Sequence, residues 1–316
     1  MKVLVTGAAG FIGSRLCGSL LDQGFTVAGV DCLTDYYDPT IKIDNIAVLL
    51  KRKRFSISYE DLVFTEIPML LRDVSIVFHL AGQPGVRDSW RYQFPLYVER
   101  NIIATHRLLE ASSEVNLERF VYSSSSSVYG QASQQPTRES TTPMPESPYG
   151  VTKLAAEHMC GVYAHARGIP SISLRYFTVF GGGQRPDMAL HRMIQSAYSG
   201  EQFEVYGDGD QRRDFTHVLD VVRANILAGL SDVPPGTCMN IAGGVSASVN
   251  ELLELVERLS GRAVPTAMRP KAAGDVRTTS ADTAFARDAL GWSPAVGLFD
   301  GVGEQIEWAR ARVTSD

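Results

Sequence analysis

The stretch Lys2-Val-Leu-Val-Thr-Gly-Ala-Ala-Gly-Phe-Ile-Gly13 decides the fold of this chain. It opens with a short apolar run typical of a buried strand, and a helical pattern over Phe11–Asp22 follows directly. Gly7, Gly10 and Gly13 permit a tight turn, close approach of a pyrophosphate and close packing of helix on strand. The free N–H groups of the helix N-terminus favour the same anion. The stretch therefore predicts a dinucleotide-binding loop.

Asp31 follows the next apolar run, Thr26–Val30, and indicates which dinucleotide is bound. A carboxylate at this position accepts hydrogen bonds from both ribose hydroxyls of NAD and repels a 2′-phosphate, so NAD is expected rather than NADP. The plainer alternative is a structural turn followed by a helix-capping aspartate. The other residues expected to contact NAD are Phe11, Ile12, Asp61, Leu62, Leu80, Ala81, Gly82, Asn101, Ser123 and Tyr176.

Apolar runs alternate with helical patterns through the first half of the chain. The strands expected are Val3–Val5, Thr26–Val30, Val74–Phe78, Arg119–Tyr122 and Ser171–Leu174. The helices expected are Phe11–Asp22, Pro95–Ser112 and Ser147–Arg167. Continuous apolar strands separated by helices indicate a parallel sheet that is buried on both faces. The fold class predicted is α/β, a Rossmann-type doubly wound parallel sheet.

The alternation breaks down after residue 174, where glycine-rich turns interrupt the chain. We therefore expect an NAD-binding domain over residues 1–174 and a smaller, mainly substrate-binding α/β region over residues 175–316. Helices are expected at Ala189–Ser199, Val218–Leu230 and Val249–Leu259. A segment near residues 215–242 is expected to pack back on the first domain.

Composition excludes several classes of protein. The 316 residues carry a formal net charge of −5 with no basic block, so nucleic acid is not an expected partner. The four cysteines are widely spaced and predict neither a metal site nor a disulfide framework. No apolar run approaches the ~20 residues that span a bilayer, so we expect a cytoplasmic protein with no membrane partner.

Tyr149 and Lys153 stand four residues apart at the start of an expected helix, so both side chains project from one face. An ammonium group beside the phenol, together with the positive nicotinamide ring, is expected to lower the pKa of Tyr149 from ~10 toward neutrality. The phenolate then accepts a proton from a sugar hydroxyl as hydride leaves the same carbon. The serine run Ser123–Ser127 follows a buried strand, at the edge where α/β sheets bind ligands. A flexible polar loop is the alternative for that run.

With these residues the chain resembles the extended short-chain dehydrogenase/reductase family, in its branch of nucleotide-sugar epimerases and dehydratases. The resemblance covers nearly the whole chain. It rests on Gly7–Gly13, Asp31, His79–Ala81, Ser123–Gly130, Tyr149–Lys153, Leu174–Phe177 and Gly207–Phe215. By position, Ser125 matches the catalytic serine or threonine, and Tyr149 and Lys153 match the other catalytic residues. Arg213 matches the arginine that holds the substrate diphosphate, and Tyr206 an aromatic residue beside uracil.

The resemblance also narrows the reaction. Dehydratases of this branch carry Asp-Glu directly after the catalytic residue, where this chain has Ser126 and Ser127, and decarboxylases tend to carry a glutamate in the same loop. The pattern around Thr178 and Arg185 is similar to that of UDP-glucuronate 4-epimerases. Arg185 with Thr178 is then expected to hold the sugar carboxylate, which a guanidinium binds through both oxygens. Alternatively, Arg185 pairs with an aspartate, Asp187 or Asp214.

The residues expected to bind the UDP-sugar come from both the N-terminal and the C-terminal part of the chain. It comprises Val86, Arg87, Ser125, Ser126, Ser127, Tyr149, Thr178, Arg185, Ala189, Leu190, Val205, Tyr206, Arg213 and Arg277. Arg277 is included because Lys271–Ala273 holds no arginine, where related enzymes have one for the diphosphate.

The reaction expected is NAD-dependent 4-epimerisation of a UDP-sugar, most directly UDP-glucuronate to UDP-galacturonate, through a 4-keto intermediate. Three alternatives stay open: a 4-epimerase for UDP-glucose or UDP-N-acetylglucosamine, a UDP-glucuronate decarboxylase, and a catalytically silent NAD-binding regulator. By analogy with the family, the helices near Pro95–Ser112 and Ser147–Arg167 are expected to pair in a homodimer.

Overall fold

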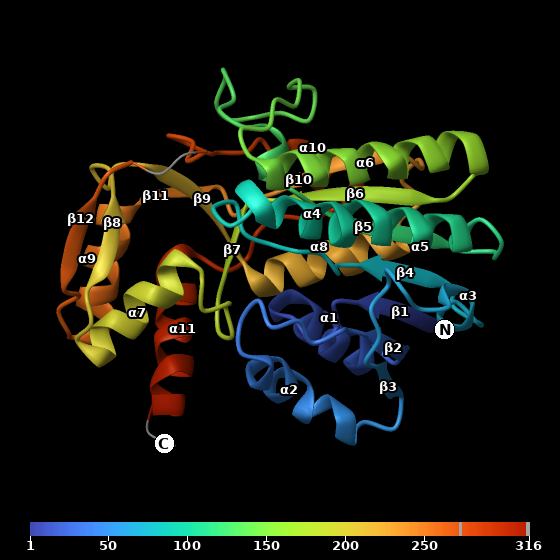
Figure 1. Cartoon of the computed structure of the whole chain (residues 1–316), viewed down its shortest axis with the longest axis horizontal. Coiled ribbons are helices and arrows are strands. Elements are labelled where there is room, and N and C mark those ends of the chain that lie inside the picture. Colours follow the sequence, from blue (N-terminus) through green and yellow to red (C-terminus); the bar gives the residue numbers. More distant parts are fainter. Residues whose placement is uncertain (272–273, 314–316) are drawn as a thin grey trace.

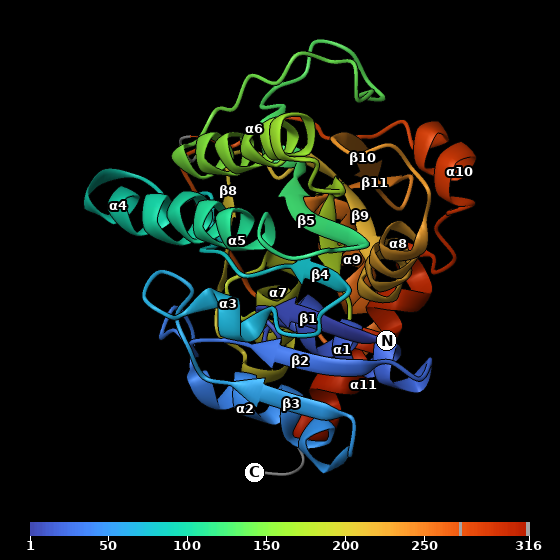
Figure 2. The ribbon, with the colours of Figure 1, turned by 90° about the vertical axis from the view of Figure 1, so that its right-hand side faces the viewer.

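The computed structural model describes residues 1–271 and 274–313. Its central sheet has the strand order β10-β6-β5-β4-β1-β2-β3 (Figure 2). The strands are β1 (Lys2–Thr6), β2 (Thr26–Val30), β3 (Phe55–Ser58), β4 (Ile76–His79), β5 (Arg119–Ser125), β6 (Ser171–Tyr176) and β10 (Thr237–Ile241). Every pairing in this sheet is parallel. The predicted Rossmann-type α/β class is confirmed.

Helices cover both faces of the sheet, as strands without polar alternation require. One face packs against α1 (Phe11–Asp22) and α8 (Val218–Leu230), with α2 (Pro39–Ala47) beside them. The other face packs against α5 (Ala104–Ser112) and α6 (Pro148–Arg167), with the short α3 (Ile67–Leu70) near its edge (Figure 2). Two apolar clusters, one on each side, hold the layers together.

Helix α6 carries the predicted catalytic pair, and its start is fixed by local chemistry. The Ser147 hydroxyl accepts a hydrogen bond from the Gly150 amide at 3.1 Å, and Pro148 occupies the first turn, where no amide donor is needed. The helix ends at Gly168, whose φ of 71° is the left-handed conformation that favours glycine. Tyr149 is therefore held on the first turn, directly beside the carboxyl end of β5.

The predicted helix Pro95–Ser112 is helical but not regular. The structure has α4 (Phe94–Tyr97), a wide π-helical turn over Val98–Ile103, and then α5. Such turns are rare and concentrate at functional sites. The sequence pattern does not reveal such a turn, because its apolar residues recur at nearly the same interval as in an α-helix.

The C-terminal elements form a smaller lobe at one end of the sheet (Figure 1). Two small sheets lie there, one of β7 (Thr178–Phe180), β9 (Arg212–His217) and β11 (Val245–Ser248), the other of β8 (Phe203–Tyr206) and β12 (Thr266–Arg269). Their apolar core is shared with α7 (Ala189–Ser199), α9 (Val249–Ser260) and α11 (Leu298–Val313). The short α10 (Ala284–Leu290) packs near β10 instead.

The chain returns to the large sheet after β9. Helix α8 packs against α1, and β10 pairs with β6. We propose an NAD-binding domain over residues 1–174 and a mainly substrate-binding region over residues 175–316. The segment near residues 215–242 packs back on the first domain. Within the described residues, no helix is both long and apolar enough to cross a membrane.

Candidate active site

The glycine loop joins β1 to α1 and forms the floor of a cavity at the carboxyl edge of the sheet. Gly7 has a φ of 69°, and a Cβ there would lie 2.9 Å from the Ala81 nitrogen. A Cβ on Gly13 would collide with the Gly7 carbonyl oxygen. The N-terminus of α1, at Gly10, receives no side-chain cap, so its amides face the cavity without a competing acceptor. This cradle fits the pyrophosphate of a dinucleotide.

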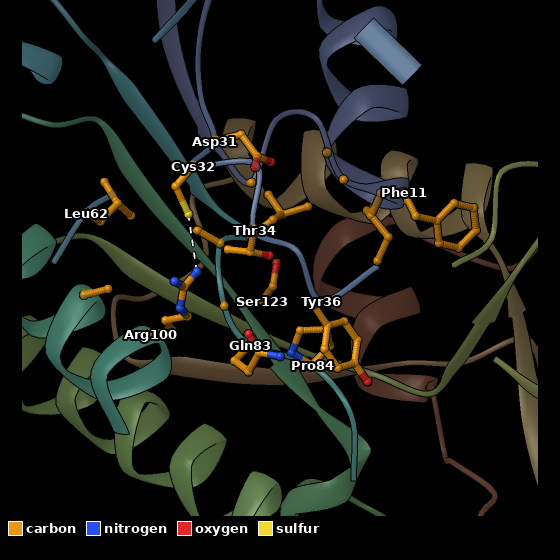
Figure 3. A pocket seen from close by; sticks show the side chains of 18 of the residues that line it. Phe11, Asp31, Cys32, Thr34, Tyr36, Leu62, Gln83, Pro84, Arg100 and Ser123 are labelled. Carbon is orange, nitrogen blue, oxygen red and sulfur yellow. Dashed lines mark hydrogen bonds between the residues drawn. The ribbon is translucent and has the colours of Figure 1, made fainter. Parts of the chain in front are cut away.

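Asp31 lines the same cavity where β2 ends, and its orientation is fixed by the backbone. Its carboxylate accepts hydrogen bonds from the amides of Ala9 at 3.0 Å and Leu33 at 2.9 Å. Each oxygen therefore keeps lone pairs for further donors such as ribose hydroxyls. Figure 3 shows this carboxylate at the cavity wall near Cys32. The donors and acceptors present suit the adenosine half of NAD.

All but one of the residues expected to contact NAD line this cavity. The exception is Asn101, which lies behind the wall in the π-helical turn. Its side chain accepts from the Gln83 amide at 2.6 Å and donates to the Gln83 carbonyl and to Thr152. Asn101 therefore shapes the loop that follows β4 rather than facing the cavity. The helical register of a wide turn differs from that of an α-helix, which explains why its direction was not predictable.

Arg100, the neighbour of Asn101, faces the cavity instead and was not predicted. Its guanidinium lies 3.5 Å from the Asp61 carboxylate and donates to the Cys32 sulfur at 3.4 Å (Figure 3). Lys42 also lines the cavity, where it donates to Thr34. Both cations stand alone in the sequence, without a motif, so no local signal identified them.

Tyr149 stands where this cavity meets a second, larger one. The two cavities share Phe11, Ile12, Pro84, Ser124, Tyr149, Tyr176 and Arg185. Burial raises the pKa of Tyr149, while the hydrogen bond with Ser125 and the positive charge of Arg185 lower it in part. The expected lowering of this pKa by Lys153 together with a bound nicotinamide ring stays a prediction.

Lys153 is buried one turn along α6, with its ammonium 4.8 Å from the centre of the Tyr122 ring. Burial lowers the pKa of Lys153 to about 8, although the charges of Cys160 and Glu157 raise it. Its cavity-facing position suits a donor to the ribose next to a nicotinamide ring. Lys153 and Tyr149 therefore line one wall, as the four-residue spacing predicts.

A buried ion pair lies directly beneath the serine run. Glu157, one turn beyond Lys153, accepts from Arg175 at 2.5 and 3.0 Å and from the Ser124 hydroxyl at 2.6 Å. Arg175 continues to the Tyr129 hydroxyl at 2.6 Å. This network ties the ends of β5 and β6 to α6, and it fixes the backbone from which Ser125 reaches Tyr149.

The second cavity lies between the sheet and the smaller lobe. Of the residues expected to bind the UDP-sugar, those that line it are Val86, Arg87, Ser125, Ser126, Ser127, Tyr149, Thr178, Arg185, Ala189, Leu190, Tyr206 and Arg213. Val205 points into the core of the lobe, with 2% of its surface exposed, because successive strand residues face opposite sides. Arg277 lies at the surface, where it pairs with Asp208 at 2.8 Å. Neither residue lines the second cavity, and both assignments stay predictions.

A cluster of cations and one aromatic ring lines the far end of the second cavity. Arg213 hydrogen-bonds Asp275, Arg87 lies 4.0 Å from the same carboxylate, and the Arg87 guanidinium is 4.1 Å from the centre of the Tyr206 ring. Asp275 was not predicted as a site residue. Ala272 and Ala273, in the segment that prompted the choice of Arg277, lie outside the described residues. Two guanidiniums sharing one carboxylate keep a net positive charge, which suits a diphosphate.

Arg185 lines both cavities and is held by an aspartate two residues away. Its Nε donates to Asp187 Oδ1 at 2.9 Å and its Nη2 to Asp187 Oδ2 at 2.8 Å. Asp187 is thus the partner, and Asp214 is occupied by backbone amides. Arg185 therefore does pair with an aspartate, as the alternative predicts. Because Arg185 also lines both cavities, the other edge of its guanidinium stays accessible.

Comparisons with known proteins agree with this geometry. Residues 3–242 match the NAD dependent epimerase/dehydratase family. An uncharacterized UDP-glucose epimerase, YtcB of Bacillus subtilis, is 43% identical over 98% of both chains. The crystal structure of UDP-glucuronic acid 4-epimerase from Bacillus cereus, in complex with UDP-glucuronic acid and NAD, is 41% identical. It covers 99% of this chain and 100% of its own, with a TM-score of 0.96.

A third protein, MoeE5, has been solved with NAD and two different sugars. Its complex with UDP-glucose is 44% identical and that with UDP-glucuronic acid 43%. Each covers 99% of this chain and 100% of its own, at a TM-score of 0.90. From the glycine cradle, the tyrosine–lysine pair and these matches along nearly the whole length, this chain belongs to the NAD dependent epimerase/dehydratase family.

Proposed function

We propose that this chain catalyses the NAD-dependent 4-epimerisation of a UDP-sugar, with UDP-glucuronate and UDP-galacturonate as its substrate pair. One observation carries the proposal: Tyr149 stands at the junction of the cavity formed by the glycine loop and the cavity that Arg87 and Arg213 line, and Arg185 lines both. A sugar ring at that junction lies within reach of a proton acceptor and a carboxylate-binding cation at once. The similarity to UDP-glucuronic acid 4-epimerase of Bacillus cereus supports the same substrate.

The chain's own groups move a proton at the sugar 4-hydroxyl. Ser125, hydrogen-bonded with Tyr149, orients the reacting oxygen, and Tyr149 accepts its proton and later returns it. Lys153 is placed to hold the ribose that carries the nicotinamide ring, next to C4 of the sugar. NAD, when bound, supplies a hydride acceptor that later gives the hydride back. The 4-keto sugar turns about its diphosphate linkage between the two steps, which inverts C4.

Arg185 and Thr178 hold the carboxylate of the acid sugar in this proposal. The 4-keto form of a glucuronate is a β-keto acid, which loses CO2 when its carboxylate stands perpendicular to the ring. Arg185 and Thr178 together hold the carboxylate in one orientation, and this opposes that loss. Ser126 and Ser127 provide no carboxyl group, which disfavours elimination of water. Arg213 and Arg87 bind the diphosphate, and Tyr206 packs on the base.

The test is turnover of a panel of UDP-sugars by the purified protein without added NAD. UDP-glucuronate should give UDP-galacturonate, resolved by chromatography, with no release of CO2. Arg185→Ala should lose most activity on UDP-glucuronate, whereas Arg52→Ala, which breaks an exposed pair with Asp22, should not. Failure to form UDP-galacturonate, or wild-type turnover by Arg185→Ala, would refute the assignment.

A second candidate is 4-epimerisation of UDP-glucose. Asp187 neutralises Arg185, so the site carries no net charge where the sugar is expected. The relative from Bacillus subtilis is described as a UDP-glucose epimerase. The panel above separates the two activities, since each substrate has its own product.

We further propose a cytoplasmic homodimer. Apolar side chains stay exposed on the helices that the family analogy assigns to the interface, namely Phe94, Ile103, Val151 and Val162. These exposed side chains are available to pack against a second copy of the chain. Sedimentation velocity should give the mass of two chains; a monomer at micromolar concentration would contradict the proposal.

A further inference from the structure

One edge of the Arg185 guanidinium is already occupied by the carboxylate of Asp187. Nε and Nη2 donate to the two oxygens at 2.9 and 2.8 Å, the side-on geometry of a strong bidentate pair. Nη1 donates no hydrogen bond to any of the residues that the structure describes. The end of the guanidinium that carries Nη1 is therefore the part left for a ligand.

Asp187 is itself held in place from a distant part of the chain. Tyr36 lies on the loop after β2, and its hydroxyl donates to Asp88 at 2.9 Å and, less closely, to Asp187 at 3.4 Å. Gly85 has a φ of 102°, and a Cβ there would collide with the Tyr36 hydroxyl. Figure 3 shows the Tyr36 ring beside Pro84, in the same loop as Gly85. Three loops thus meet at the Arg185–Asp187 pair.

The charge of Asp187 persists at neutral pH. Burial raises the pKa of Asp187, but the hydrogen bonds and charge of Arg185 outweigh it, and the net direction is down. Both side chains are more than two-thirds buried, at 23% and 30% exposure, so water screens their charges only in part. A ligand at the free edge of Arg185 therefore experiences both charges of the pair.

We propose that Asp187 determines the sugar specificity of this site by cancelling the charge of Arg185. The site then accepts UDP-sugars with neutral hexoses as well as those with acidic ones. The inference rests on the proposed function in that it takes UDP-sugars as the ligands. A sugar carboxylate gains from Arg185 but is repelled by Asp187 behind it. A sugar with a neutral hydroxymethyl group meets a compensated ion pair instead of an unpaired buried cation.

The predicted consequence is that removing the charge of Asp187 favours the acid. Asp187→Asn keeps the size of the side chain and one acceptor for Arg185, while it leaves the guanidinium without a counter-charge. An acidic ligand then supplies the missing charge, and a neutral one does not. One unit charge at the far edge of the same guanidinium in a partly screened site is worth about tenfold in affinity.

The experiment measures binding of UDP-glucuronate and UDP-glucose to the NAD-loaded enzyme by calorimetry, together with steady-state KM and kcat. Asp187→Asn should bind UDP-glucuronate about tenfold more tightly and UDP-glucose within about twofold of wild type. Asp187→Ser, which also removes the charge, should shift the ratio the same way if the asparagine variant folds poorly. A ratio that is unchanged, or that falls, overturns the proposal.

Two further variants separate charge compensation from a merely structural effect. In an Arg185→Gln background, Asp187→Asn should leave the affinity ratio unchanged, because no cation remains to compensate. Asp22→Asn, the same chemical change in an exposed pair with Arg52, should leave it unchanged in the wild type. Wild type that binds both sugars but forms no UDP-galacturonate would refute the proposed function alone, since the ratio still tests Asp187.

Discussion

The substitution Glu157→Gln tests whether the ion pair beneath the active site holds it together. Glu157 and Arg175 are 3% and 6% exposed, and Ser124 adds a third hydrogen bond to the carboxylate. The amide keeps the volume but leaves the Arg175 guanidinium buried without a counter-charge. Breaking a buried pair from one side costs about 3–5 kcal/mol. Because Arg175 keeps its hydrogen bond to Tyr129, we expect the lower end, about 3 kcal/mol.

The assay is urea unfolding of wild type and variant, with free energies extrapolated to water. The matched control is Glu307→Gln, whose pair with Arg310 is exposed and 3.9 Å long, and which should cost less than about 0.5 kcal/mol. Adding Arg175→Met to Glu157→Gln should recover part of the loss, because both charges are then gone. A loss no larger than that of the control, or additive losses in the double variant, would refute this reasoning.

The same substitution has a signature in the pH dependence of turnover. Burial lowers the pKa of Lys153 to about 8, and the negative charge of Glu157 opposes that shift. Removing the charge should lower the pKa of Lys153 further, so the protonated form is lost at a lower pH. The alkaline limb of the turnover profile should move to lower pH. An alkaline limb that stays in place would show that Glu157 does not influence Lys153.

Three further predictions concern the cofactor cradle and the sheet beneath it. Gly13→Ala should abolish NAD binding measured by calorimetry, because the added methyl collides with the Gly7 carbonyl oxygen; retained affinity would contradict this. Asp31→Asn should weaken NAD and relax the exclusion of NADP, by about tenfold in the ratio of dissociation constants, since the repelling charge is gone; an unchanged ratio argues against the ribose role. Burial lowers the pKa of His79 from 6.5 to about 3, so between those values the unfolded chain binds a proton that the folded one does not. The unfolding free energy should therefore fall by about 1.4 kcal/mol per pH unit as the pH drops through that window, and His79→Gln should remove this part of the slope.

Local spacing determined the parts of this protein that depend on backbone geometry. The interval between Gly7 and Gly13 requires a tight turn between strand and helix, and four residues are one helical turn, so Tyr149 and Lys153 share a face in any helix. The position of Asp31 at a strand end likewise follows from the alternation of apolar runs. The parallel sheet and the cavity-lining positions of these residues are therefore readable from the sequence.

Side-chain direction in the loops was decided only by the tertiary structure. The π-helical turn aims Arg100 at the cavity and Asn101 behind it, and a surface pair with Asp208 draws Arg277 away. The sequence left two aspartates as partners for Arg185, Asp187 in the same loop and Asp214 far along the chain, and in the folded loop, which contacts Tyr36, the partner is Asp187. Periodicity fixes the register of a helix or strand, but a loop side chain takes its direction from charges and contacts that meet only after folding.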